Sequence, residues 1–353
     1  MSDSQEQPKP SDIEAVERLG ESYRRIRAEL SKAIVGQDSV VEELLISVLA
    51  GGHCLLVGVP GLAKTLMVRT LADTLDLTFS RIQFTPDLMP ADITGTEVIQ
   101  ENRSSGEREF RFLEGPVFAN VVLADEINRT PPKTQAALLE AMQERQVTAG
   151  GHRHKLPAPF FVLATQNPIE QEGTYPLPEA QLDRFMFEVR VDYPDEDEEF
   201  QIVRQTTSEF EPQISPVLSR EDIQQLQGTV RRIPVADHII RYAMQFSRLT
   251  RREKGDVPDF VSEFVSWGAG PRASQYLILG ARARAMLQGR ACVSTDDVKA
   301  VATPVLRHRI ITNFNAEAEG ITSDEIILRL TEHIDGNSSG SIAGGRFAKV
   351  LKS

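Results

Sequence analysis

Short runs of apolar residues alternate with longer, helically spaced patterns through the first 215 residues. The apolar runs predict four short buried strands, at residues 53–57, 121–124, 160–165 and 187–191. Apolar residues spaced three and four apart predict helices over residues 38–49, over a stretch that contains Met67, Leu71 and Leu75, and over 135–144 after a start at Thr130. Strands that alternate with helices indicate an α/β fold with a parallel sheet covered on both faces.

The two ends of the chain have a different pattern of apolar and polar residues. Residues 13–30 form an amphipathic helical pattern, and beyond Pro216 the pattern is helical throughout. Residues after 336 are rich in Gly and Ser. We therefore expect a disordered tail over 1–11, an α/β core over 12–215, a separate, smaller helical domain over 216–335 and a flexible tail over 336–353.

Composition narrows the class of protein. The 353 residues are 41% hydrophobic and 25% charged, as in ordinary soluble proteins. The formal charge of -12 argues against a dedicated nucleic-acid binder, which needs a basic surface. Two cysteines without metal-ligand spacing, and no signal peptide or apolar stretch of about 20 residues, favour a cytoplasmic protein. Six carboxylates within residues 192–199 indicate an acidic first turn of a helix rather than a metal site.

A glycine loop follows the first strand and leads into a helix. Backbone N–H groups of such a loop can bind a triphosphate, Lys64 can neutralise its β- and γ-phosphates, and the Thr65 hydroxyl can bind Mg²⁺. The residue before the lysine, Ala63, departs from the usual glycine; a left-handed φ would disfavour alanine there, whereas a helical φ would accept it. The loop reads Gly58-Val59-Pro60-Gly61-Leu62-Ala63-Lys64-Thr65.

Polar residues follow two further strands. Asp125 and Glu126 end an apolar strand, where Asp125 can hold Mg²⁺ and Glu126 can polarise an attacking water. Asn167 follows the next strand and can help to orient that water, although an Asn-Pro turn would explain it equally simply. Together with the upstream loop, these residues predict an ATP- and Mg²⁺-binding site.

These motifs resemble those of AAA+ ATPases of the P-loop NTPase class, and in particular the MoxR family, which is of the helix-2-insert type. The resemblance covers roughly residues 30–335 and includes the alanine before the lysine. Its marks are Val35-Gly36-Gln37, the loop at 58–65, Asp125-Glu126-Ile127-Asn128-Arg129, residues 135–144, residues 164–168 and residues 178–185. The fold implied is a parallel-sheet core with a C-terminal helical lid.

The resemblance also implies roles for individual residues. Arg184 would be the arginine finger that enters the ATP site of the neighbouring subunit, unless it merely pairs with Asp183 or a surface acid. Arg272, at the head of a lid helix, would be the sensor that reaches the γ-phosphate, with ATP bound between the core and the lid of one subunit. Gly36 and Gln37 would lie near the adenine.

Two insertions match the family and predict hairpins. One consists of residues 93–100 and 109–113 around a polar turn, and the other of residues 146–156. In related rings such hairpins face the central pore and touch the substrate. His152 and His154 can share one strand face, but without a third ligand nearby an exposed arm is favoured over a metal site.

The resemblance therefore implies an ATP hydrolase that works as a homo-hexamer. It would remodel or mature a client or adaptor protein, with a partner that carries a von Willebrand factor A domain on a separate chain. Two alternatives stay open: a motor on nucleic acid or a metal-chelatase subunit, and a nucleotide-regulated scaffold that binds ATP without hydrolysing it.

Overall fold

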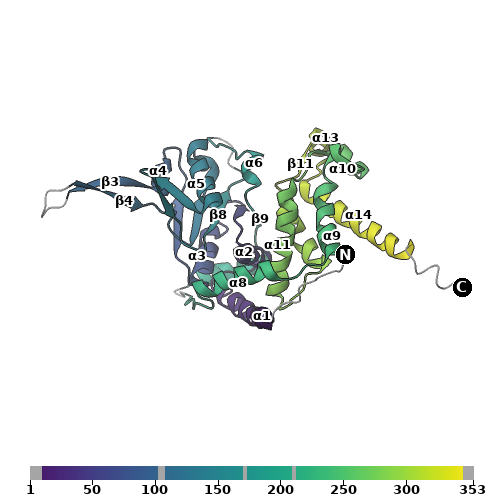
Figure 1. Cartoon of the computed structure of the whole chain (residues 1–353), viewed down its shortest axis with the longest axis horizontal. Coiled ribbons are helices and arrows are strands. Elements are labelled where there is room, and N and C mark those ends of the chain that lie inside the picture. The colour runs from purple at the N-terminus through teal and green to yellow at the C-terminus, as the bar shows by residue number, and fades with distance from the viewer. Residues whose placement is uncertain (1–9, 102–107, 170–172, 209–211, 345–353) are drawn as a thin grey trace.

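The central sheet has the predicted parallel arrangement. A computed structural model describes residues 10–101, 108–169, 173–208 and 212–344 (Figure 1). The sheet has five parallel strands in the order β2-β5-β8-β1-β9, so β1, which precedes the glycine loop, lies between β8 and β9. The strands are β1 Cys54–Val57, β2 Phe79–Gln83, β5 Val121–Asp125, β8 Phe161–Gln166 and β9 Phe187–Arg190.

Successive residues of the inner strands are buried on opposite faces of the sheet. Cys54 and Leu56 belong to one hydrophobic cluster and Leu55 to the other, and all three are almost fully buried. This double burial explains why the four apolar runs predict strands correctly. The pattern does not predict β2, because that edge strand contains only two apolar residues, Phe79 and Ile82.

Helices cover both faces of this sheet, as expected. One face packs against α1 Pro10–Leu30, α2 Asp38–Ala50 and α3 Lys64–Thr74, and the other against α4 Pro90–Thr94 and α5 Pro132–Glu144. Three shorter elements complete the core: η1 Ile127–Arg129, α6 Glu179–Leu182 and α7 Glu196–Thr206. α5 starts two residues later than predicted, because the Thr130 hydroxyl donates to the carbonyl of Thr85 instead of capping the helix.

The C-terminal part is mainly helical, as predicted, and it packs against the core. Its elements are α8 Arg220–Arg232, α9 Asp237–Arg248, η2 Arg252–Lys254, α10 Asp259–Phe264, β10 Val265–Trp267, α11 Pro271–Leu287, α12 Thr295–Leu306, β11 Ile311–Thr312, α13 Phe314–Glu319 and α14 Ser323–Gly344. α11 packs on α2, and one hydrophobic cluster runs from the sheet through these helices. The predicted limits of the two domains stay a prediction, and α11 contacts the core as well as α12.

The predicted limits of both tails also need correction. Pro10 and Ser11 form the first turn of α1, where proline is tolerated because its missing N–H has no helical acceptor. α14 continues to Gly344, past the predicted limit at residue 336, because its buried apolar residues anchor a helix that each further residue can extend. Residues 1–9 and 345–353 lie outside the described part.

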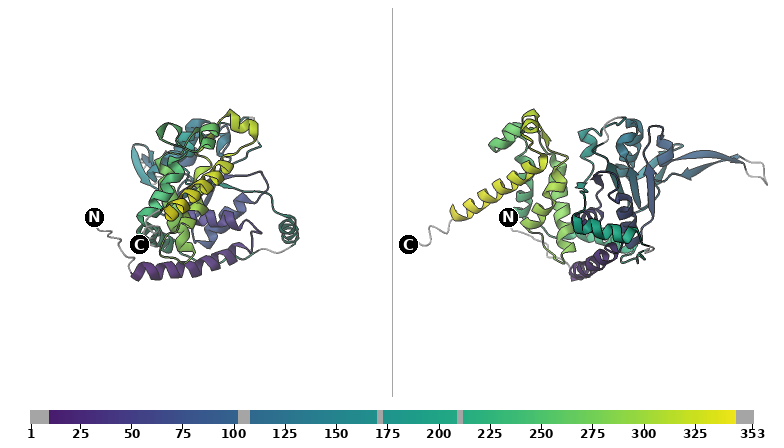
Figure 2. Two further views of the ribbon diagram at one scale, coloured as in Figure 1. Left: turned by 90° about the vertical axis from the view of Figure 1, so that its right-hand side faces the viewer. Right: turned by 180° about the vertical axis from the view of Figure 1, so that it is seen from behind.

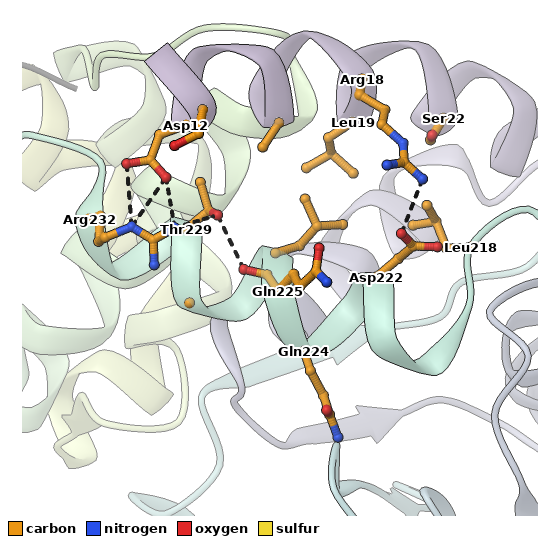
Figure 3. Close-up of a pocket in the computed structure, with 14 residues that line it drawn as sticks. Asp12, Arg18, Leu19, Ser22, Leu218, Asp222, Gln224, Gln225, Thr229 and Arg232 are labelled. Carbon is orange, nitrogen blue, oxygen red and sulfur yellow. Dashed lines mark hydrogen bonds and ion pairs between the residues drawn. The ribbon is translucent and has the colours of Figure 1, made fainter. Parts of the chain in front are cut away.

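α1 packs against both the core and the lid. It contacts α3 of the core and α11 of the lid (Figure 2). Two ion pairs also join it to α8: Arg232 with Asp12 at 2.6 Å and Arg18 with Asp222 at 3.1 Å. These pairs lie at the two ends of a pocket of about 470 Å³ between the helices (Figure 3). α8 also packs on α2, so it belongs to the core as much as to the lid.

Both predicted hairpins are present. They are β3 Gly95–Glu101 with β4 Arg108–Glu114, which projects from the body (Figure 1), and β6 Gln146–Ala149 with β7 His152–Lys155. Ile93, predicted to begin the first hairpin, is buried in α4 instead. His154 stacks on Phe112 of β4 at 3.8 Å between ring centroids, so the hairpins pack together. No cluster of three or more His, Cys, Asp or Glu suited to a metal occurs among the described residues.

The acidic run forms the predicted helix start. Asp195 caps α7 by accepting from the N–H of Glu198, and the Glu198 carboxylate accepts from the N–H of Asp195. The carboxylates that follow stand near the positive end of the helix dipole. In the same described ranges, no helix is long and apolar enough to cross a membrane.

Candidate functional site

The glycine loop lies at the carboxyl edge of the sheet, where ligands bind in open α/β folds. Gly58 is required by a close approach, because a Cβ there would lie 2.6 Å from the carbonyl oxygen of Val191. Gly61 is required by its backbone, whose φ is +88°. Each glycine thus has its own physical reason, and the loop runs from β1 directly into the N-terminus of α3.

Ala63 and Lys64 complete the loop. Ala63 has φ 51°, in the left-handed region, so the helical φ that would accept alanine is not the one observed. The Lys64 ammonium donates to the carbonyls of Gly58 and, at 3.2 Å, of Val59. Partial burial lowers the pKa of Lys64, and the nearby charges of Asp125 and Glu126 oppose that shift. The structure therefore brings the predicted lysine and both predicted acids together.

Thr165 at the end of β8 fixes the acid pair. Its hydroxyl donates to Oδ1 of Asp125 at 2.7 Å and accepts from the N–H of Glu126 at 2.8 Å. Glu126 adopts a left-handed φ of 57°. Such strain in a non-glycine residue is typical of functional sites. Thr165 lay in a predicted strand, but nothing in the sequence distinguishes it as a site residue.

Two residues of the unpredicted strand β2 also contact the acids. Arg81 donates to Oδ2 of Asp125 at 2.6 Å, and Gln83 donates to Oε2 of Glu126 at 2.8 Å. Arg129 approaches the same Oε2 at 3.0 Å. The carboxylate of Glu126 is therefore held by a neutral and a cationic donor, and it must leave them before it can act as a base.

Asn167 stands where it was predicted, directly after β8. It is 6% exposed, and its Oδ1 accepts from the N–H of Ile169 at 3.1 Å. That bond is the local turn contact expected from an Asn-Pro sequence. Its amide nitrogen forms no hydrogen bond within the described part of the chain, so it is available at the carboxyl edge.

An apolar cavity of about 360 Å³ adjoins the loop. Gln37, predicted to lie near the adenine, lines it, and its Nε2 donates to the carbonyl of Asp192 at 3.0 Å. Gly36 beside it has φ +66°, and a Cβ there would collide with the carboxylate of Glu198. Sequence reasoning missed the α7 side of this cavity, where Tyr193 and Val203 expose 73% and 54% of their surface.

The oxygen donors of this edge suit a magnesium–triphosphate. Mg²⁺ prefers oxygen ligands and needs few from the protein, because phosphates and waters supply the others. Thr65 in the first turn of α3 and Asp125 at the end of β5 offer a hydroxyl and a carboxylate. Gly58 leaves no room for a side chain beside the loop backbone. The predicted donor set therefore fits the group.

Arg184 and Arg272 lie at the opposite edge. With Arg145 they line a second cavity of about 190 Å³ beside residues 51–53, which precede β1. The Arg184 guanidinium forms no ion pair or hydrogen bond in the described ranges. Asp183 does not pair with it, because its carboxylate contacts Arg272 at 2.7 Å and Arg309 at 2.8 Å. The alternative that Arg184 merely pairs with Asp183 was wrong.

The position of Arg272 also differs from the prediction. No residue of 260–330 lines the cavity beside the phosphate loop, so the lid of the same subunit does not close over it. The reason lies in packing, since α11 is held against α2 and Arg272 is held by Asp183. Arg184 and Arg272 therefore line the same cavity, and both lie away from the phosphate loop of their own chain.

Comparison with known proteins agrees with these features. Residues 53–187 match the ATPase family associated with various cellular activities (AAA), and residues 260–330 match the AAA lid domain. Chaperone MoxR1 of Mycobacterium tuberculosis is 43% identical over 92% of this chain and 85% of its own length. Protein MoxR of Paracoccus denitrificans is 32% identical over 82% of this chain and 88% of its own.

A solved structure shows the same architecture. A crystal structure of a candidate ATPase from Cytophaga hutchinsonii superposes with a TM-score of 0.84 at 42% identity, covering 91% of this chain and 97% of that one. The similarity thus covers most of the length of this chain and of each of these relatives. The chain belongs to the MoxR family of AAA+ ATPases.

Proposed function

We propose that the chain hydrolyses Mg·ATP in a ring of six identical subunits, each site being completed by Arg184 and Arg272 of a neighbour. One observation carries this proposal: the phosphate loop and the two arginines lie at opposite edges of one sheet. β1 has four residues, which corresponds to about 13 Å between the edges. A head-to-tail contact between copies would bring one subunit's arginines to the next subunit's loop, and such contacts form a ring when the rotation from copy to copy closes.

Each residue of the carboxyl edge then has a task. Lys64 would hold the β- and γ-phosphates, and Thr65 and Asp125 would hold the magnesium, whose charge would offset that of the transferred phosphoryl group. Asp125 would exchange its contact with Arg81 for the magnesium. Glu126, once released by Gln83 and Arg129, accepts the proton of the attacking water, and Asn167 orients that water. Arg184 and Arg272 stabilise the charge that develops on the γ-phosphoryl oxygens.

The client is proposed to be a protein. The relative from M. tuberculosis is named a chaperone, and we extend that role to this chain, acting in the cytoplasm with a separate von Willebrand factor A partner. The projecting hairpin supports it: Ile99 and Phe110 pair across β3 and β4 and expose 61% and 74% of their surface. Changing both to Ser should leave basal turnover intact and abolish binding of a permanently unfolded polypeptide, measured by fluorescence anisotropy. Unchanged binding would contradict this role.

A mixing experiment tests the shared site. Glu126→Gln removes the base and should lower turnover by about 10²–10⁴. Arg184→Ala removes the finger and should lower it by about 10³ or more. A 1:1 mixture should recover about one quarter of the wild-type rate, because that fraction of random interfaces joins an intact site to an intact finger.

The mixture distinguishes the shared site from its alternatives. Recovery requires that the base and the finger act from different subunits, so a mixture as inactive as its parts would refute the trans arrangement. Full turnover in both single variants would refute the role assignments altogether. Wild-type protein that binds ATP tightly but never releases phosphate, even at concentrations that assemble the ring, would support a scaffold instead.

A further inference from the structure

The segment that carries Arg184 is held by its backbone, and the lid holds it. Four consecutive carbonyl oxygens, those of Asp183, Arg184, Phe185 and Met186, all accept hydrogen bonds from lid side chains. The distances run from 2.6 Å for Phe185 to 3.3 Å for Arg184. We call residues 183–186 the finger segment.

Arg309 makes most of these contacts. Its Nη2 donates to the carbonyls of Asp183 at 2.9 Å and Phe185 at 2.6 Å, and its Nη1 donates to that of Met186 at 3.2 Å. Its Nε donates to the Asp183 carboxylate at 2.8 Å. One guanidinium thus spans the whole segment from a position directly after α12.

Three neighbours complete the arrangement. Tyr276 donates its hydroxyl to the carbonyl of Arg184, and its ring lies 5.2 Å from the Arg309 guanidinium carbon. His308 lies 3.2 Å from the carbonyl of Phe185 through its Nε2. Arg272 donates to the Asp183 carboxylate. Tyr276 and Arg272 line the cavity of Arg184 as well, so the same side chains form that cavity and fix the segment behind it.

The Arg309 guanidinium is a buried charge, and its burial costs free energy unless close partners compensate it. Its side chain is 2% exposed, and a charge removed from water must be compensated by close partners. Asp183 is shared with Arg272, so one carboxylate faces two guanidinium groups. Backbone carbonyls supply the remaining acceptors: three of them belong to Asp183, Phe185 and Met186 around Arg184, and one belongs to Val305 of α12.

The Arg184 guanidinium has no partner of its own in the described chain, so its position depends on where its backbone is held. We propose that Arg309, with Tyr276, is a positioning residue for Arg184, which fixes the finger segment to the lid and transmits lid movement to the finger. This inference rests on the proposed trans role of Arg184. ATP-driven rotation of a lid would then place or withdraw the finger offered to the neighbouring site.

Arg309→Met tests the inference, since it removes the guanidinium and keeps most of the volume. Turnover should fall by about 10²-fold, approaching the Arg184→Ala value, while Mg·ATP binding stays within about twofold of wild type. Arg282→Met is the matched control, because Arg282 is also a lid arginine with a backbone acceptor, but it is only partly buried and donates to the carbonyl of Arg231, away from the finger segment. It should keep wild-type turnover.

Mixing separates positioning from a general loss of structure. Arg309→Met should regain turnover with Glu126→Gln, which supplies an intact finger, and should not regain it with Arg184→Ala, which supplies none. Turnover that recovers with both partners, with neither, or that never fell in Arg309→Met would overturn the inference. Should turnover persist in Arg184→Ala as well, the proposed function fails; if only Arg184→Ala is inactive, the positioning role alone fails.

Tyr276→Phe keeps the inference testable if Arg309→Met does not fold. It removes a single hydroxyl and leaves the ring in place. Loss of one hydrogen bond should lower turnover by about three- to tenfold, with the same one-sided recovery on mixing. Wild-type turnover in a folded Tyr276→Phe, together with a misfolded Arg309→Met, would count against the inference.

Discussion

The two edges of the sheet are assembled in different ways. At the carboxyl edge, the loop with Lys64, the acid at Asp125 and the amide of Asn167 each follow directly on the end of a strand. At the amino edge, Arg184, Arg145 and Arg272 come from three unrelated positions: the turn before β9, the C-cap of α5 and the first turn of α11. The first edge gathers the residues proposed to hold Mg·ATP, whereas the second gathers three arginines beside one cavity.

The difference between the two edges is tested most directly by removing one cationic side chain from each. Lys64→Met should lower the affinity for Mg·ATP by about 100-fold, which corresponds to about 2.7 kcal/mol, because the lysine contacts the phosphates of its own subunit. Arg145→Met should change affinity by less than about twofold in dilute, monomeric protein, since its cavity lies at the other edge. Titration with a fluorescent ATP analogue measures both.

In the assembled ring, unlike in the monomer, Arg145→Met should have a clear effect. At concentrations that assemble it, Arg145→Met should reduce turnover by about tenfold, because its charge then faces the neighbour's nucleotide. Glu144→Gln, which changes the exposed acid beside it, is the control and should keep wild-type turnover. Equal losses of affinity in monomeric Lys64→Met and Arg145→Met would refute the separation of the two edges.

The carboxyl edge was largely predictable because its chemistry is local in sequence. Lys64 and Thr65 are adjacent, the acids are adjacent, and each group stands where an apolar run stops. Arg81 and Gln83 escaped prediction because β2 is an edge strand with only two apolar residues, too few to mark a strand. Thr165 escaped because a threonine inside a buried strand carries no periodic signal of function.

The amino edge was predictable only through resemblance, and its geometry was not. Nothing in the spacing of Arg184 and Arg272 indicates that they share a cavity, because the contact depends on how α11 packs against α2. The contacts of Arg309 were even less predictable from the sequence. Its partners are mostly backbone carbonyls, which every residue has, so the sequence holds no pattern that joins it to residues 183–186.

Glu43 of α2 provides a test of this packing, because α2 contacts α11 and so helps to position the side chains of the amino edge. Burial raises the pKa of Glu43 to about 7, and Arg307 opposes the shift while Glu42 and Asp324 add to it. The unfolded chain releases this proton near pH 4.5 and the folded chain near pH 7, so the folded state binds more protons between these values. Stability contributed by Glu43 therefore falls as pH rises from about 4.5 to 7 and stays lower above that range.

Glu43→Gln should remove this loss. At pH 8 the variant should be more stable than wild type by about 2 kcal/mol, less than the full shift would give because the side chain keeps some contact with water. At pH 4.5 the two proteins should have nearly equal unfolding free energies, which provides the internal control. Urea denaturation at both pH values measures the difference. A gain of the same size at pH 4.5 would show that Glu43 is not protonated in the folded protein.

The smallest expected effect concerns Ala63, where the carboxyl edge holds a strained residue. A left-handed alanine costs about 1–2 kcal/mol, which glycine avoids, but glycine also gives the unfolded chain about 0.5–1 kcal/mol of extra entropy. Ala63→Gly should therefore raise the unfolding free energy by about 0.5 kcal/mol, or about 1 °C in Tm. Ala136→Gly, at an exposed position inside α5, should lower stability by about 1 kcal/mol, because helical φ gives glycine no advantage. Losses of equal size in both variants would mean that Ala63 does not hold the left-handed conformation in solution, and that this loop reaches its phosphate-binding shape only when the nucleotide supplies the energy.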